Sequence, residues 1–455
     1  MKNFVKEEAA DIMGIASRIK RRDLKGNSGQ TIKNSSWQLA TTLVAKTGSL
    51  LFTVIIARLM LPELYGLYGL ALSTIIFFGI FSDFGIGATL MTFLSKTIDK
   101  RPEKAKGYFY FLTKYKIFLV ISTSLILLSL ASWFAHSYYN KPIHYALLAG
   151  AIYLPIMILA NYLVPLFSTR NNFQPQFIRE IIFQTVRLTI IPLSIIYFLS
   201  KISSTEIYLF WIFILISFCY FLGGIYLLIV AKLSHPFGQT KTQGLNSKEK
   251  DELIKFILPL SVTALSGVFF GFIDQIMLGH YVASQFLGFY QASFNLITAA
   301  SALIAFSSIA VFPIFARLKG RTLERGFKKT RNITFLISIT TAVFTFILAP
   351  LIIGIIYGTE YSTAIIYLRI LSLLIISFPL ISIYSTYYTS QKRTKIIAIL
   401  LISSTILNII LNYIFINIGL NFSMSYAVIG ACLATIISRF GYLGGLVFFR
   451  GWKGK

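Results

Sequence analysis

Long apolar segments separated by short polar ones dominate this chain of 455 residues, of which 56% are hydrophobic and only 13% charged. A membrane-spanning helix needs roughly 20 mostly apolar residues. About twelve segments reach that length, at residues 37–61, 64–94, 108–134, 144–167, 177–199, 207–231, 253–278, 286–315, 332–356, 361–389, 396–418 and 426–449. We therefore predict an all-α integral membrane protein with about twelve transmembrane helices.

The net charge of +26 is concentrated in alternate segments between these apolar stretches. Lys and Arg crowd both ends of the chain and residues 96–106, 232–255, 317–331 and 392–395, whereas the intervening segments hold little more than Lys141 and Lys201. Because loops rich in Lys and Arg stay on the cytoplasmic side, both termini are predicted to be cytoplasmic, in a multi-pass protein of the plasma or inner membrane. Membrane orientation explains the charge without nucleic acid, and we expect the basic segments to contact anionic lipids.

Two halves of the sequence resemble each other. Gly66 and Tyr68 match Gly288 and Tyr290 at one constant offset along the chain, and a basic turn repeats at the same offset. With six spans each, the two halves enter the membrane from the same side, which predicts parallel pseudo-symmetric lobes with substrate held between them. The predicted parts are a basic cytoplasmic leader (1–35), an N-lobe (36–231), a cytoplasmic linker (232–252), a C-lobe (253–449) and a cytoplasmic tail (450–455).

The sequence lacks the short motifs of common enzymes. It holds no Walker A loop, no His-Glu-x-x-His, no Cys-x-x-Cys and no nucleophile elbow. No segment outside the spans is long enough to fold as a soluble catalytic domain. We therefore predict a transporter and not an enzyme, without cofactor or metal, acting as a monomer.

Charged side chains inside the apolar segments are the candidate functional residues, because a charge in hydrocarbon is costly and usually marks a substrate path. Two acids, Asp83 and Asp274, accompany a larger set of cations, and this excess of positive charge suggests an anionic substrate. The seven cations are Lys46, Arg58, Lys114, Lys116, Arg187, Arg369 and Arg439.

The depth of each cation within its span separates these candidates. Lys46, Arg187 and Arg369 lie too deep to reach water easily and are predicted to line a cavity and bind substrate. Lys114 and Lys116 start near the cytoplasmic end, where snorkelling explains them. Two further candidates are ambiguous, and the predicted substrate-binding set is therefore Lys46, Arg187, Arg369, Arg58 and Arg439.

The two acids are candidate ion-coupling residues. Asp83 lies toward the inner end of the second span and would equally pair with a lysine structurally. Asp274 lies near the outer end of the seventh span, where it would pair with a cation, carry a proton or ligate Na⁺. The sequence leaves these alternatives open, with H⁺ and Na⁺ as the candidate coupling ions.

Several motifs together resemble Wzx-type polysaccharide flippases, within the superfamily of multidrug, oligosaccharidyl-lipid and polysaccharide exporters. The resemblance covers nearly everything after Ser35, but family members often have Gly where this chain has Leu61, and the basic leader is longer than the family needs. The motifs are the run from Ala57 to Tyr68, Asp83-Phe84-Gly85-Ile86-Gly87-Ala88, Lys255 to Leu260, Asp274 to Gly279, Ile356-Tyr357-Gly358 with Tyr361, Asn408, Asn412, and Gly430 to Thr435.

The resemblance implies a twelve-span, two-lobed flippase that works by alternating access. Its substrate would be a polyprenyl-diphosphate-linked oligosaccharide, moved from the cytoplasmic to the outer leaflet for cell-surface polysaccharide synthesis. Two alternatives remain: a cation-coupled exporter of drugs or small metabolites from the same superfamily, and a membrane-embedded glycosyltransferase or polymerase. The excess of buried cations counts against the first, and the short external segments count against the second.

Overall fold

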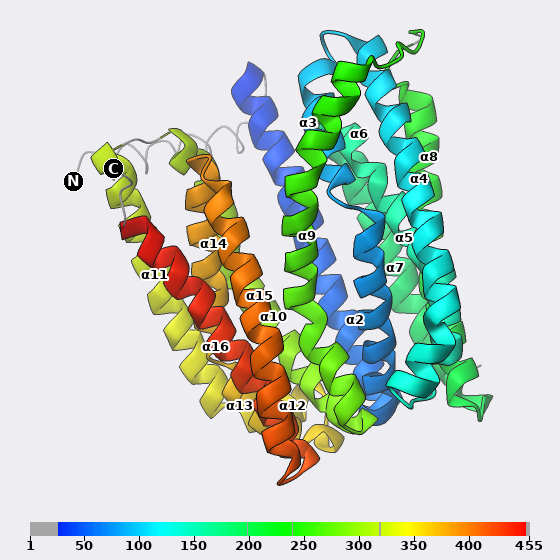
Figure 1. Ribbon diagram of the computed structural model, residues 1–455, viewed down its shortest axis with the longest axis vertical. Helices are drawn as coiled ribbons and strands as arrows, with labels where there is room; N and C mark the ends of the chain where they lie inside the picture. Colours follow the sequence, from blue (N-terminus) through cyan, green and yellow to red (C-terminus); the bar gives the residue numbers. More distant parts are fainter. Residues whose placement is uncertain (1–25, 198, 239, 318–319, 452–455) are drawn as a thin grey trace.

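The computed structural model describes residues 26–197, 199–238, 240–317 and 320–451, and every regular element in these ranges is helical (Figure 1). Most of the predicted leader, residues 1–25, and the tail residues 452–455 lie outside the described residues. The helices are α2 (Gly26–Gly79), η1 (Ile80–Ser82), α3 (Ile86–Thr97), α4 (Pro102–Ser132), η2 (Trp133–Tyr138), α5 (His144–Tyr162), α6 (Val164–Ser168), α7 (Gln174–Tyr197), η3 (Leu199–Lys201), α8 (Thr205–Ser234), α9 (Ser247–Tyr281), α10 (Ser284–Arg317), α11 (Gly320–Ile347), α12 (Ala349–Ile356), η4 (Thr359–Tyr361), α13 (Ala364–Leu371), α14 (Leu374–Ser390), α15 (Thr394–Leu420) and α16 (Met424–Gly451).

The helices confirm a multi-pass all-α membrane protein. Within the described ranges, ten helical segments are long and apolar enough to cross a membrane, or eleven when the bent helix α9 is counted as one span. One of the ten, Ser36–Ser82, contains 47 residues, more than twice the length that one span needs. It holds the first predicted span and residues 64–82 of the second, whose remaining residues form a turn and part of the separate helix α3. Each of the other predicted segments overlaps with described helices.

The chain reverses direction inside α2, so this element is a hairpin of two helices. Leu61 has φ 59° and ψ 171°, and Pro62 follows it directly. Proline cannot donate a helical hydrogen bond but fits the first turn of a new helix. The left-handed φ of Leu61 is strained for a residue with a side chain, which explains physically why Gly suits this turn in similar sequences.

The helices form two groups that share a continuous core toward one end of the molecule. Helices α2–α8, here called the N-terminal bundle, and α9–α16, the C-terminal bundle, lie side by side (Figure 1). At the end that carries the basic segments, here called the basic end, there are two separate buried clusters of apolar side chains. One joins helices of the N-terminal bundle to Leu253 near the start of α9, and the other lies among α9, α10, α11, α14 and α16. Toward the opposite end a single continuous core runs through both bundles. The bundles therefore share a continuous core at the end opposite the basic segments, and at the basic end α9 packs against the N-terminal bundle.

The repeated glycines build a close contact between the bundles. A Cβ atom on Gly66 would lie 1.9 Å from the carbonyl oxygen of Ser284, and one on Gly288 would lie 2.0 Å from that of Pro62. Ser284 matches Pro62 at the same offset that relates the two glycines, so the contact is reciprocal, as a two-fold axis requires. The sequence repeat thus marks the place where α2 and α10 cross with their backbones in contact.

A second reciprocal pair of contacts lies at the same end of the molecule. Arg58 Nε donates to the carbonyl oxygen of Ile356 at 2.8 Å, at the C-terminus of α12. His280 matches Arg58 at the repeat offset and places its Nδ1 2.5 Å from the carbonyl oxygen of Tyr138 at the end of η2. Each half therefore reaches from its first span to carbonyls at the end of the other half's third span.

Gly288→Ala tests the close crossing. The added methyl group meets the backbone of Pro62, which cannot rotate away as a side chain can, so we expect a loss of about 1–3 kcal/mol of stability. Thermal unfolding of the purified protein in detergent measures it. Gly354→Ala on α12, where a Cβ meets nothing within 4 Å, is the matched control. Equal melting temperatures for the two variants would contradict the crossing described here.

Candidate substrate and ion sites

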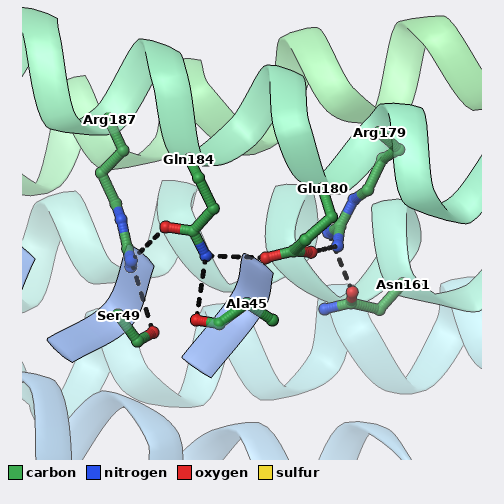
Figure 2. Close-up of polar contacts among 7 residues, drawn as sticks. All are labelled: Ala45, Ser49, Asn161, Arg179, Glu180, Gln184 and Arg187. Carbon is green, nitrogen blue, oxygen red and sulfur yellow. Dashed lines mark hydrogen bonds and ion pairs between the residues drawn. The ribbon is translucent and has the colours of Figure 1, made fainter. Parts of the chain in front are cut away.

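A ladder of polar side chains runs along α7 inside the N-terminal bundle (Figure 2). Gln184 stands at its centre, where its Oε1 accepts from Arg187 at 2.7 Å and its Nε2 donates to Glu180 at 2.7 Å. Arg179 donates to Glu180 at 3.0 Å and to Asn161 on α5 at 2.9 Å. Residues three and four apart share one helix face, which is why Glu180, Gln184 and Arg187 meet.

Arg187 is stacked between aromatic rings. Its guanidinium carbon lies 4.2 Å from the ring centroid of Phe52 and 4.8 Å from that of Phe183. The side chain donates to Ser49 on α2 at 3.3 Å, and its Nε has no hydrogen-bond partner among the described residues. In that part of the chain Arg187 forms no ion pair. Its described contacts are therefore aromatic rings and neutral acceptors.

Two of the predicted substrate-binding cations, Lys46 and Arg187, lie near Ser49 on α2. Lys46 is exposed and precedes Ser49, the partner of Arg187, by one helical turn on α2. Arg187 itself is only 9% exposed. The sequence predicted that both would line a cavity. In the structure the Lys46 side chain is exposed, and the Arg187 side chain is buried against α2.

Arg179 and Glu180 were missing from the set of charges derived from the sequence. Both lie within the predicted fifth span, and both are more than nine-tenths buried. The signal was present in the sequence as adjacent opposite charges near the start of an apolar segment. Glu180 is thus a third acid inside the predicted spans, and the expectation of two was wrong.

Asp274 lies at the centre of a second polar cluster, in the C-terminal bundle. Its Oδ1 accepts from Asn412 at 2.6 Å, and its Oδ2 accepts from Thr435 at 2.5 Å and from Tyr290 at 2.9 Å. Within the described residues, the amide of Asn408 and the Oδ1 of Asn412 are buried without a hydrogen-bond partner. The cluster therefore offers several oxygen atoms, the ligands that hard cations prefer.

Asp83 forms an ion pair with Lys116 on α4. Lys116 is only 2% exposed, so the prediction that it snorkels to water was wrong, whereas the structural pairing considered for Asp83 is present. The pair lines a pocket of about 280 Å³ together with Asn161 and Tyr162. Asn161 connects this pocket to the ladder on α7, because its Oδ1 accepts from Arg179.

The remaining cations lie apart from these clusters. Arg58 contacts α12 at the junction of the bundles, and Lys114 is exposed on α4. The guanidinium carbon of Arg369 lies 5.7 Å from the ring centroid of Phe346 on α11. Arg439 lies 3.5 Å from the ring centroid of Phe270 and donates to its carbonyl oxygen. The predicted cations thus do not gather at a single site.

Comparisons with known proteins fit this arrangement. A family model described as "Polysaccharide biosynthesis protein" matches residues 31–319. The chain belongs to this family. A second model, MatE, matches residues 259–414, which places the family within the exporter superfamily that the motifs resembled, among transporters and not enzymes. A search of curated proteins finds no match.

Solved structures with the same fold come from two groups of transporters. A lipid II flippase MurJ in an inward closed conformation has a TM-score of 0.67 at 17% identity, covering 91% of this chain and 87% of that one. An inward-facing multidrug resistance MATE family transporter has a TM-score of 0.66 at 13% identity, covering 91% and 99%. The eukaryotic MATE transporter AtDTX14 gives 0.56 at 14% identity, covering 92% and 96%. At such identities the likeness establishes the fold alone.

Substitutions at the Asp83–Lys116 pair test whether this pair is structural. Asp83→Asn leaves the buried ammonium of Lys116 without its carboxylate. Because the Asp83 side chain is 42% exposed, we expect a loss below the roughly 3–5 kcal/mol of a fully buried broken pair. Lys116→Met removes the buried charge itself and is expected to be nearly neutral. Melting temperatures in detergent measure both, and a reversed order would contradict a structural pair.

Proposed function

We propose that this protein is a flippase for polyprenyl-diphosphate-linked oligosaccharides in cell-surface polysaccharide synthesis. It carries the substrate from the cytoplasmic to the outer leaflet of the cell membrane, by alternating access of two parallel six-span lobes. The lobes comprise residues 36–231 and 253–449, with 232–252 as their cytoplasmic linker. Support comes from the polysaccharide biosynthesis family match and from a structural relative whose name is lipid II flippase.

The observation that carries this proposal is the state of Arg187. It is a deeply placed guanidinium with neutral hydrogen-bond acceptors only, Ser49 and Gln184, and the exposed Lys46 lies one turn from Ser49. A diphosphate crossing a low-dielectric core needs compensation of its negative charge. Arg and Lys are the side chains that supply it, Arg through paired hydrogen bonds to phosphate oxygens.

The orientation of the membrane follows from the basic segments. With the basic end in the cytoplasm, the continuous core that joins the bundles lies on the outer side. The two separate apolar clusters lie on the cytoplasmic side, where lipid-linked glycans are assembled. An inside-negative potential favours outward movement of an anion by about 2.3 kcal/mol per charge per 100 mV. The polyprenyl chain stays in lipid while the glycan passes between the lobes.

The Asp274 cluster is the proposed site of coupling to a cation. A proton on Asp274, or Na⁺ held by its carboxylate with Asn412 and Thr435, would neutralise a buried charge in one transport state. Oxygen atoms within the membrane-spanning region hold coupling ions in many transporters. The cluster lies where four helices of the C-terminal bundle meet, so its occupancy would change how those helices pack.

A second candidate function is export of drugs or small metabolites. The MatE match over residues 259–414 includes both Asp274 and Asn412, and it favours this alternative for the C-terminal bundle. Accumulation of a lipophilic cation in cells with and without the protein separates the two functions. The exporter predicts lower accumulation with the protein, whereas the flippase predicts no difference.

Transport of a fluorescent lipid-linked oligosaccharide in proteoliposomes tests the substrate site. Lys46→Ala and Arg187→Ala are each expected to slow flipping by about tenfold or more, since each removes a charge-assisted contact to the diphosphate. Lys114→Ala, at an exposed cation of α4, is the matched control. Undiminished transport in both Lys46→Ala and Arg187→Ala would remove the basis of the anion site.

Asp274→Asn tests the coupling site. The substitution keeps the shape of the side chain but removes its charge, so transport by this variant is expected to become independent of an imposed Na⁺ or H⁺ gradient. Flipping rates are measured in proteoliposomes with each gradient in turn, and Asp251→Asn, at an exposed acid near the start of α9, serves as the control. A gradient response equal to that of the wild type would exclude Asp274 from coupling.

A further inference from the structure

We propose that Glu180 and Gln184 are positioning residues that hold the guanidinium of Arg187 ready for a diphosphate while keeping a carboxylate away from it. The inference rests on the proposed function and concerns the same substrate site. It assigns a purpose to the buried ladder of α7 (Figure 2), which neither the family match nor the fold explains.

The chemistry of the partners dictates how the amide of Gln184 is oriented. An ionised carboxylate only accepts hydrogen bonds and a guanidinium only donates them. With Glu180 on one side and Arg187 on the other, the Nε2 of Gln184 must face Glu180 and its Oε1 must face Arg187. The orientation of the amide is therefore set by the charges of Glu180 and Arg187 on its two sides, and it presents an acceptor to Arg187.

The carboxylate of Glu180 is held by a second partner, Arg179. Arg179 donates to Glu180 Oε2, and a second nitrogen of Arg179 donates to Asn161 on α5. The side chains of Arg179, Glu180 and Gln184 are each less than a tenth exposed. Hydrogen bonds to charged groups in such surroundings are strong, so Arg179 satisfies Glu180 and leaves its charge little influence on Arg187.

The ladder also fixes α7 against the helix that carries Lys46. Gln184 Nε2 lies 3.3 Å from the carbonyl oxygen of Ala45. A Cβ atom on Gly48 would lie 2.5 Å from the Gln184 side chain, so only glycine admits this contact. Gln184 thus touches α2 on both sides of the Lys46 turn and sets the separation of Lys46 and Arg187.

A neutral amide at residue 184 has a consequence for anion binding. A carboxylate in its place would form an ion pair with Arg187 and compete directly with a diphosphate. An amide orients the guanidinium with a single hydrogen bond of 2.7 Å and leaves the positive charge uncompensated. Arg179, whose charge is already paired with Glu180, cannot substitute for Arg187.

The exchange variant Glu180→Gln/Gln184→Glu tests this inference, because it keeps the composition, the net charge and the number of donors while placing the carboxylate against Arg187. Full-length protein in detergent is titrated with farnesyl diphosphate, and with farnesol as the probe without a diphosphate. We expect the exchange to weaken farnesyl diphosphate binding by about tenfold or more, with farnesol binding unchanged. Thr185→Ala, at an exposed residue of the same helix, is the matched control.

Glu180→Gln is the second variant and decides the matter if the exchange variant does not fold. An amide at residue 180 offers Gln184 Nε2 a neutral and therefore weaker acceptor than the carboxylate. Gln184 is then held less firmly against Arg187, so farnesyl diphosphate binding is expected to fall severalfold. Unchanged diphosphate affinity in the folded variants would overturn the positioning role. A wild type that binds farnesyl diphosphate no better than farnesol would overturn the anion site as well. Selective diphosphate binding without oligosaccharide transport would refute the proposed function alone.

Discussion

The backbone contact between α2 and α10 is the constraint on which the rest of the architecture depends. Lipid gives helices no hydrophobic reason to associate, so close packing of small residues and polar contacts must hold them together. Gly66 and Gly288 permit that packing, and the polar links of Arg58 and His280 lie at the same end. With the bundles joined there, the continuous core lies toward that end and the basic end keeps two separate cores.

Much of this fold could be predicted from the sequence because it follows from local pattern. Hydrophobic length defined the helices, and the glycine repeat indicated the internal symmetry. The reversal at Leu61 falls at the break between the first two predicted spans, 37–61 and 64–94. The structure adds that the matching glycines touch each other, which periodicity alone cannot reveal, because the repeat gives equivalence between the halves and no distance between them.

The sites were less predictable, because the partner of a buried charge depends on how each helix is rotated in the bundle. Depth alone suggested that Lys116 would snorkel, yet its helix turns it toward Asp83. Two partners of Asp274, Asn412 and Thr435, lie 138 and 161 residues later in the chain. No local sequence pattern operates over such separations. Arg179 and Glu180 were visible as charges, but their importance lies in the ladder, which only the packing of α7 against α2 and α5 creates.

The repeat also shows where the two halves have diverged. Asp274 matches Phe52 at the repeat offset, within the stretch that leads without a gap into the matching glycine motifs. One half therefore has a carboxylate where the other has the ring on which Arg187 stacks. Under the proposed function, the two equivalent positions serve ligands of opposite charge. Phe52 belongs to an anion site in the N-terminal bundle, and Asp274 belongs to a cation site in the C-terminal bundle. Both helices involved, α2 and α9, lead directly into the crossing of Gly66 and Gly288. Occupancy of either site therefore bears on the same contact between the bundles. This is the physical requirement for coupling two ligands through one conformational change.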